Sequence, residues 1–464
     1  MPEGGPPRLA DLLRGIARYQ LRGDGATRVG SLAPSSRDAQ PGALYFSVPS
    51  PNRLAAVAAA VRCGASAIVT DRWMPAEVVQ VKVPSVVRSI GPIASEFFGR
   101  PHERMTMIGV TGTNGKSTVV HLLHAIFAAA GVADATIGTT GAWVGARPVA
   151  AGDLTTPEAV DLQALLARLA SEGVQSVAME VTSHALAQYR VDGVRFASSI
   201  FTNLSPAHLD FHGDSNAYFE AKARLFTPEK TELGVVNVDA SKGRELAGRV
   251  PCLTYGTASG ADLLAEGVEA DASGVRFRLG GRWVRTRLRG RFNVHNCLAA
   301  IGAASSVGID RDVAARAVES VEGLPGRMEV FTTPGGVRVV HDAFNANPAS
   351  LAAGVEAARA LATDGRLAVI LGTMAELGAR SASEYIRAGR TVARLGADRL
   401  VTVGSDAQVA AEAVGDHGSS TTFASCLGIS EALDDLARWA RAGDTVYVKG
   451  SRVAGLEAIA AALR

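Results

Sequence analysis

Short apolar segments alternate with amphipathic segments along most of the chain. In the first hundred residues this pattern predicts strands at 43–48 and 67–69 and helices at 54–63 and 90–98. An apolar strand at 105–110 then leads into a glycine-rich turn. In the helix that follows, apolar residues recur every three or four positions until Gly131 ends it. Alternating strands and helices indicate an α/β protein with mainly parallel sheets and helices on both faces.

The alternation of strands and helices continues in three blocks. Later strands are expected at 175–180, 198–202, 233–237, 337–341, 367–371, 400–403 and 445–448. A turn at 323–326 separates the last of these blocks, and 464 residues are too many for one hydrophobic core. We therefore predict three domains, at 1–103, 104–326 and 327–464, with catalysis in the cleft where they face each other.

Composition and charge argue against several classes of protein. Hydrophobic residues make up 47% of the chain and charged residues 20%, which is typical of a globular protein. The net charge is only +2 and there is no run of lysines or arginines, so no nucleic-acid partner is expected. The N-terminus lacks the pattern of a signal peptide, and no apolar stretch is long enough to span a bilayer. We expect a cytoplasmic protein without membrane insertion.

The turn after the strand at 105–110 has the pattern of a phosphate-binding loop. It reads Thr111-Gly112-Thr113-Asn114-Gly115-Lys116-Ser117 and opens a helix. The glycines let backbone N–H groups approach phosphate oxygens, Lys116 can reach the β- and γ-phosphates, and Ser117 can ligate Mg²⁺. Val110 stands where the general GxxxxGK[ST] motif has its first glycine. The strand before the loop and the helix after it still favour a nucleotide site over a plain glycine turn.

Three further segments carry groups suited to metal and phosphate chemistry. Glu180 ends the strand at 175–180, beside the loop, where an acidic group can hold Mg²⁺. His208 belongs to a loop, residues 201–213, with two histidines and an aspartate, which alone could be a capped turn. Lys222 lies on a helix among small and apolar residues. Such a lysine is usually a surface cation, but a desolvated lysine has a lowered pKa, and its free amine can react with CO₂ to form a carbamate.

The TGTNGKS form of the loop resembles that of the Mur ligases, the cytoplasmic amide ligases of peptidoglycan synthesis, and the likeness extends over nearly the whole chain. The resemblance implies an ATP-dependent ligase that activates a carboxylate as an acyl phosphate and couples it to an amino acid or short peptide, releasing ADP and phosphate. It also implies a UDP-type substrate-binding domain at the N-terminus, a central P-loop ATPase-like domain, and a Rossmann-like, amino-acid-binding domain at the C-terminus.

The resemblance also implies roles for individual residues. The catalytic residues implied are Lys116, Glu180, His208 and Lys222. Two Mg²⁺ ions are expected on Ser117, Glu180, His208 and a carbamylated Lys222. ATP is expected on Gly112, Thr113, Asn114, Gly115, Lys116, Ser117 and Thr118, with Asn296 at the adenine, Arg327 at the hinge and Asp342 at the ribose.

The segments expected to bind the substrates resemble two different Mur ligases. Four candidates for the acceptor site lie in segments like those of the ligase that adds the third peptide residue to a UDP-N-acetylmuramoyl peptide, namely Thr155, Thr156, Ser183 and Arg190. Residues 342–348, 371–378 and 448–452 instead resemble the D-alanyl-D-alanine-adding ligase. These two patterns leave open whether the incoming amine is an amino acid or a dipeptide.

The first domain carries a shortened version of the expected uridine site. Ser36 lies in a segment, residues 35–46, that resembles the uridine-binding segment of the family. The loop that should follow is replaced by the shorter Pro49-Ser50-Pro51-Asn52-Arg53. Two acceptors therefore stay open, a UDP-linked muramoyl peptide and a carboxylate without UDP from specialised metabolism. A third hypothesis, a nucleotide-binding regulator without catalysis, is disfavoured because the chain carries both sets of predicted metal ligands.

Overall fold

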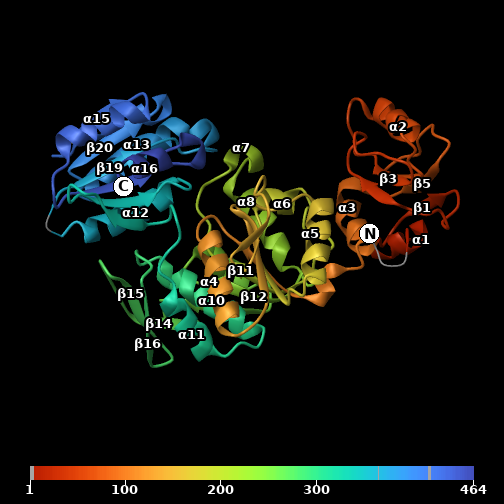
Figure 1. Cartoon of the computed structure of the whole chain (residues 1–464), viewed down its shortest axis with the longest axis horizontal. Coiled ribbons are helices and arrows are strands. Elements are labelled where there is room, and N and C mark those ends of the chain that lie inside the picture. The colour runs from red at the N-terminus through yellow and green to blue at the C-terminus, as the bar shows by residue number, and fades with distance from the viewer. Residues whose placement is uncertain (1–4, 364, 416–419) are drawn as a thin grey trace.

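The structure is a computed structural model that describes residues 5–363, 365–415 and 420–464. Three sheets follow one another along the chain and lie in a row, with the second sheet in the middle (Figure 1). The predicted α/β class is confirmed, with a mainly parallel central sheet and a Rossmann-like third sheet. Within the described ranges, no helix is long and apolar enough to cross a membrane. The domain limits inferred from the sequence stay predictions.

The first sheet contains five strands in the order β1-β5-β4-β3-β2, of which only β1 runs antiparallel to its neighbour. Its elements are β1 (Gln20–Arg22), β2 (Ser31–Ala33), β3 (Ala43–Phe46), β4 (Ala67–Thr70), β5 (Val79–Lys82), α1 (Leu9–Leu12), α2 (Arg53–Arg62) and α3 (Val86–Phe97). Phe46 packs in one core cluster with Ile93 of α3, whereas Tyr45 packs in another with Val57 of α2. Successive strand residues point to opposite faces, so this sheet is covered on both sides.

Eleven strands form the second sheet, in the order β16-β15-β14-β13-β12-β11-β6-β10-β7-β8-β9. They are β6 (Thr106–Thr111), β7 (Asp134–Gly138), β8 (Gly141–Val144), β9 (Arg147–Ala150), β10 (Ser176–Glu180), β11 (Phe196–Phe201), β12 (Thr231–Asn237), β13 (Cys252–Gly256), β14 (Leu263–Asp271), β15 (Gly274–Leu279) and β16 (Arg282–Thr286). The seven consecutive strands β14-β13-β12-β11-β6-β10-β7 pair in parallel. Antiparallel strands extend the sheet at both ends, β15 and β16 beyond β14 and β8 and β9 beyond β7.

Helices cover both faces of this central sheet. They are α4 (Lys116–Ala129), α5 (Ala159–Ser171), α6 (Ser183–Ala187), α7 (Leu209–His212), α8 (Ser215–Ala223), α9 (Ser241–Ala247), α10 (Asn293–Ser306) and α11 (Arg311–Ser320). Residues of α4, α10 and α11 share one core cluster, and residues of α5, α6, α8 and α9 share the other. Because β6 lies between β10 and β11, the loop that follows β6 meets the carboxyl ends of both strands.

The third sheet has six strands in the order β17-β18-β22-β19-β20-β21, all parallel except β17. The strands are β17 (Glu329–Thr332), β18 (Arg338–Asp342), β19 (Leu367–Leu371), β20 (Arg399–Val403), β21 (Thr422–Cys426) and β22 (Thr445–Lys449). The helices are α12 (Pro348–Leu361), α13 (Ser381–Arg394), α14 (Gln408–Gly415), α15 (Ile429–Trp439) and α16 (Glu457–Ala462). Short 3₁₀ turns occur at Leu13–Gly15, Pro101–Arg104, Arg224–Phe226, Gly378–Arg380, Ser405–Ala407 and Arg452–Ala454.

The predicted parallel strands are confirmed, most of them within two residues, and the helix expected after the glycine-rich turn ends at Ala129, just before Gly131. The strands not predicted from the sequence are β1, β2, β5, β7 to β9, β13 to β17 and β21. In β15 and β16, buried Val275, Phe277 and Val284 alternate with arginines, so a period-two signal was available there.

Candidate functional site

Two glycines shape the loop between β6 and α4. Gly112 has φ +142, and a Cβ there would lie 1.9 Å from Thr202 Oγ1. Gly115 has φ +92, and a Cβ would lie 2.4 Å from Asn296 Oδ1. A larger residue would strain the backbone and also clash with these neighbours. Helix α4 begins at Lys116, so the positive end of its dipole lies at the loop.

Side chains from the end of β11 hold the loop in place. Asn203 Oδ1 accepts from Asn114 N at 3.0 Å, and Asn203 Nδ2 donates to Asn114 O at 3.0 Å. Within the loop, Lys116 Nζ donates to the carbonyl oxygens of Gly112 and Thr113 at 2.9 and 3.0 Å. Burial lowers the pKa of Lys116, although the charge of Glu180 acts in the opposite direction. The lysine therefore lies along the loop backbone, where it can contact a phosphate bound there.

Glu180 ends β10 and is buried directly beside the loop. Its Oε1 accepts from Ser117 Oγ at 2.7 Å and from Thr139 N at 3.1 Å. Gly138 leaves room for this carboxylate, because a Cβ at that position would lie 2.4 Å from Glu180 Oε1. The Ser117 hydroxyl and the Glu180 carboxylate are oxygen ligands of the type that Mg²⁺ prefers. This pair fits a metal ion next to the phosphate loop.

Lys222 is only 1% exposed and lies beneath the phosphate loop. Its Nζ donates to Gly112 O at 3.0 Å and lies 4.4 Å from the centre of the Tyr218 ring. Burial, and to a smaller extent the nearby charge of Lys116, hold the pKa of Lys222 well below its usual value. The sequence alone left a surface cation and a desolvated amine open, and the structure has the desolvated amine.

His208 lies at the start of α7 and faces the third sheet. It has a left-handed backbone, φ +55, and its Nδ1 lies 2.5 Å from Glu376 Oε2. The rings of His184 and His208 are 4.9 Å apart, and the His212 ring lies 5.5 Å from that of His184. Burial and then the charge of His184 lower the pKa of His212 to about 4, so His212 is neutral at pH 7. The structure thus groups three histidines at one end of the cleft.

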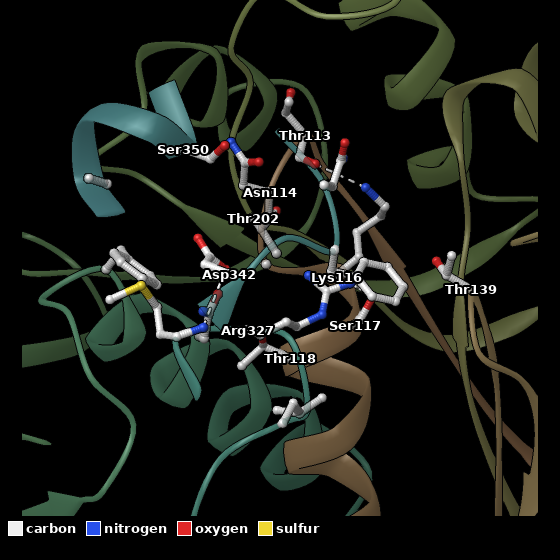
Figure 2. A pocket seen from close by; sticks show the side chains of 18 of the residues that line it. Thr113, Asn114, Lys116, Ser117, Thr118, Thr139, Thr202, Arg327, Asp342 and Ser350 are labelled. Atoms are coloured by element: carbon white, nitrogen blue, oxygen red, sulfur yellow. Dashed lines mark hydrogen bonds between the residues drawn. The ribbon is translucent and has the colours of Figure 1, made fainter. Parts of the chain in front are cut away.

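Three residues predicted to contact the nucleotide lie on α10, just before β17 and at the end of β18. Asn296 on α10 is buried and donates to Asn293 Oδ1 at 2.7 Å. Arg327 Nη2 donates to Ser117 Oγ at 2.7 Å (Figure 2), and burial lowers its pKa. Asp342 accepts from Lys449 Nζ at 2.5 Å and Tyr447 Oη at 2.9 Å. Since Lys449 is buried, the charge of Asp342 is balanced inside the third sheet.

A cavity of about 950 Å³ connects most of these groups, with walls from residues of both the second and the third domain expected from the sequence. Figure 2 shows Lys116, Ser117 and Arg327 pointing into it. Predicted residues in its lining are Thr113, Asn114, Gly115, Lys116, Ser117, Thr118, Thr155, Glu180, His208, Asn296, Arg327 and Asp342. Predicted residues outside the lining are Ser36, Gly112, Thr156, Ser183, Arg190 and Lys222.

Of the five candidate acceptor residues, Thr155 lines the cavity and the other four do not. Thr156 is buried, and its Oγ1 donates to Glu180 O at 2.9 Å, so it fixes the strand end that carries the carboxylate. Arg190 forms an ion pair with Glu158 at 2.9 Å, and Ser183 is buried as the first residue of α6. Ser36 lies in the loop between β2 and β3 of the first sheet. The structure therefore does not bring all five candidate residues together.

Three residues of the site were not singled out from the sequence. They are Asn203, which holds the loop, Asn347, whose Nδ2 donates to Asn114 Oδ1 at 2.8 Å, and Glu376. All three lie in segments that the family resemblance had marked, residues 201–213, 342–348 and 371–378. The resemblance could have pointed to these residues. It could not show their contacts, because the partner of each residue lies in a distant part of the chain.

The fold and the loop define a nucleotide-binding α/β protein of the P-loop type. Comparison with known proteins narrows this class. The Mur ligase middle domain matches residues 110–304, and the Mur ligase, glutamate ligase domain matches residues 326–452. Two similar proteins are UDP-N-acetylmuramoyl-L-alanyl-D-glutamate--2,6-diaminopimelate ligases. That of Alkalilimnicola ehrlichii is 37% identical over 72% of this chain and 71% of its own length, and that of Streptomyces coelicolor is 39% identical over 70% and 68%.

Solved structures agree with this fold. A structure of a UDP-N-acetylmuramoyl-L-alanyl-D-glutamate--2,6-diaminopimelate ligase matches with a TM-score of 0.72 and 23% identity, covering 96% of this chain and 93% of the other. MurF from Acinetobacter baumannii matches with a TM-score of 0.69 and 22% identity over 99% and 98%. The chain belongs to the Mur ligase family, the ATP-dependent ligases of peptidoglycan biosynthesis.

Proposed function

We propose that this chain joins an amino acid or short peptide to the carboxylate of a UDP-N-acetylmuramoyl-peptide-type acceptor, through an acyl phosphate, with release of ADP and phosphate. The observation that carries the proposal is the convergence of Lys116, Glu180, His208 and Arg327 on one cavity between two sheets. The curated relatives support the acceptor, because their names specify UDP-N-acetylmuramoyl-L-alanyl-D-glutamate.

The residues of the cleft would have separate roles in phosphoryl transfer. The ATP phosphates bind along the loop, where the α4 dipole and Lys116 stabilise their negative charge. Ser117 and Glu180 would hold one Mg²⁺, and His208 with carbamylated Lys222 a second. Metal ions at these positions would offset the charge of the phosphate oxygens. Arg327 reaches the loop from the start of the third sheet and stabilises the charge on the transferring phosphoryl group.

The acceptor carboxylate would enter beside Thr155, which lines the cavity. Thr156 holds the end of β10 by its hydrogen bond to Glu180 O, and Ser183 begins α6. Arg190, which donates to Thr156 O, would exchange its exposed partner Glu158 for an anionic acceptor. Ser36, in the loop between β2 and β3, is the candidate for the remote UDP end of the acceptor. In this arrangement the acceptor extends from the first sheet to the phosphate loop.

The test is phosphate release from Mg-ATP with UDP-N-acetylmuramoyl-L-alanyl-D-glutamate and its tripeptide homologue, combined with 2,6-diaminopimelate, D-alanyl-D-alanine or single amino acids. Each reaction is checked by mass for an amide product. We expect one pair to give product and Lys116→Ala to abolish ADP formation, because the loop loses its phosphate-binding cation. Lys82→Ala, in the first sheet, is the matched control and should retain activity. Turnover that survives Lys116→Ala, or ATP consumption only with acceptors lacking UDP, would refute the proposal.

A further inference from the structure

Among the residues that the structure describes, five carboxylates line the cavity, and one of them differs from the rest in its partners. Glu322 and Glu329 contact Arg287 and Arg464, and Asp342 is paired with Lys449. Glu180 receives the hydroxyl of Ser117 and a backbone N–H. Glu376 has only the His208 ring as a partner among the described residues, and half of its side chain is exposed. A carboxylate can accept about four hydrogen bonds, so Glu376 can accept further donors from the cavity.

The backbone around Glu376 is held in a strained position. Glu376 has φ +65, in the left-handed region that residues other than glycine rarely adopt. The two residues before it are fixed: Met374 N donates to Tyr385 Oη at 2.7 Å, and Ala375 N donates to Ser451 Oγ at 3.0 Å. Strain of this type persists where surrounding contacts impose it, often at functional sites. These contacts direct the carboxylate towards His208 and the phosphate loop.

Arg452 presents a positive charge from the adjoining loop. It directly follows Ser451, the residue bonded to the Glu376 segment, and its side chain is exposed and lines the same cavity. The other lysines and arginines of the lining contact a carboxylate, a hydroxyl or a carbonyl oxygen. The Arg452 side chain has no hydrogen bond or ion pair to any described residue, and none joins it to Glu376 within 4 Å. A guanidinium and a carboxylate thus face one cavity on neighbouring loops without neutralising each other.

We propose that Glu376 binds the ammonium group and Arg452 the carboxylate of the incoming amine, which makes the amine substrate an unblocked amino acid or short peptide. The inference rests on the proposed function, because it assigns the ends of the second substrate. An ammonium group at Glu376 lies next to His208, at the end of the cavity that leads to the phosphate loop. Bidentate pairing with a carboxylate is the interaction for which an arginine is best suited.

The first test measures binding alone, so its result does not depend on ligase turnover. Calorimetry with Mg-ADP present would compare 2,6-diaminopimelate, D-alanyl-D-alanine and single amino acids with their N-acetylated and C-amidated forms. We expect a free zwitterion to bind, and either blocking group to weaken binding by about ten- to a hundred-fold, as expected for loss of one charge-assisted hydrogen-bonding group. Glu376→Gln should remove the discrimination against N-acetylation, and Arg452→Gln the discrimination against amidation.

Control variants distinguish recognition from a structural role. Glu412→Gln and Arg390→Gln change exposed residues of α14 and α13 and should bind every probe as the wild type does. If Glu376 only fastened the third sheet to His208, Glu376→Gln would weaken Mg-ATP binding as much as amine binding. That result, equal binding of blocked and free probes, or no binding of any free zwitterion would overturn the inference. A wild type that binds zwitterions but forms no amide would instead contradict the proposed function.

Discussion

At the residue scale, Lys222 shows how burial changes the chemistry of a side chain. Among the described residues, no carboxylate balances its charge, and its Nζ donates to the carbonyl oxygen of Gly112 in the phosphate loop. Burial and then the charge of Lys116 lower its pKa, so the neutral amine is present at a lower pH than for an exposed lysine. Only the neutral amine attacks CO₂, and the resulting carbamate would supply the anion that the second metal site needs.

We predict that Lys222 carries a carbamate when bicarbonate is present. Carbon-13 NMR in labelled bicarbonate should show a carbamate carbonyl signal that is absent in Lys222→Met. The signal should decrease as the pH falls, because protonation of the amine removes the nucleophile. Lys82→Met, on the first sheet, is the control and should keep the signal. An unchanged spectrum in Lys222→Met would show that the modified lysine lies elsewhere.

At the scale of elements, β7 and β10 cooperate to place the acidic metal ligand. They pair in parallel, so Gly138 at the end of β7 lies beside Glu180 at the end of β10. The absence of a side chain at Gly138 gives the carboxylate its place between Ser117 and Thr139. The φ of Gly138 lies outside the left-handed region, so an alanine would fit the backbone and displace only the carboxylate.

Gly138→Ala should therefore weaken metal binding without unfolding the protein. A Cβ 2.4 Å from Glu180 Oε1 forces the carboxylate away from Ser117, and loss of such support typically costs about 10–100-fold in metal affinity. The Mg²⁺ dependence of ADP formation measures this, with Gly248→Ala as the control because its nearest neighbour would be 3.6 Å away. An unchanged Mg²⁺ dependence in Gly138→Ala would mean that Glu180 is not a metal ligand.

At the scale of the whole molecule, polar contacts hold the third sheet against the phosphate loop. Asn347 Nδ2 donates to Asn114 Oδ1 at 2.8 Å, Arg327 contacts Ser117, and Glu376 contacts His208. Polar contacts of this kind are typical of domains that move relative to one another. We therefore expect the third sheet to open to admit substrates and to close again over the loop.

Asn347→Ser should favour the open arrangement while leaving the fold intact. Asn347 also caps α12, and serine can take over the cap but not the contact with Asn114. We expect a larger radius of gyration in solution X-ray scattering and a free energy of unfolding within about 1 kcal/mol of the wild type. Asn52→Ser, at the start of α2, is the matched control. Identical scattering curves for wild type and Asn347→Ser would contradict this role.

Much of the fold could be predicted because it depends on neighbours in the sequence. The glycine-rich loop, the strand before it and the helix that Gly131 ends are local patterns, and the structure has them at those positions. The parallel strands follow from apolar runs separated by helices. Strands β8 and β9 were harder to predict because each has only four residues, and β9 is mostly exposed and begins with an arginine and a proline.

The sequence by itself determined the α/β class, the phosphate loop and the identity of most groups in the cleft, because these depend on residue type and short spacing. Only the tertiary structure decided which groups meet. Asn114 and Asn347 are 233 positions apart, and Glu376 reaches His208 from another sheet. It also decided that Lys222 is buried and that Thr156 supports Glu180. Such outcomes depend on how sheets pack and exclude water, which no local pattern of residues records.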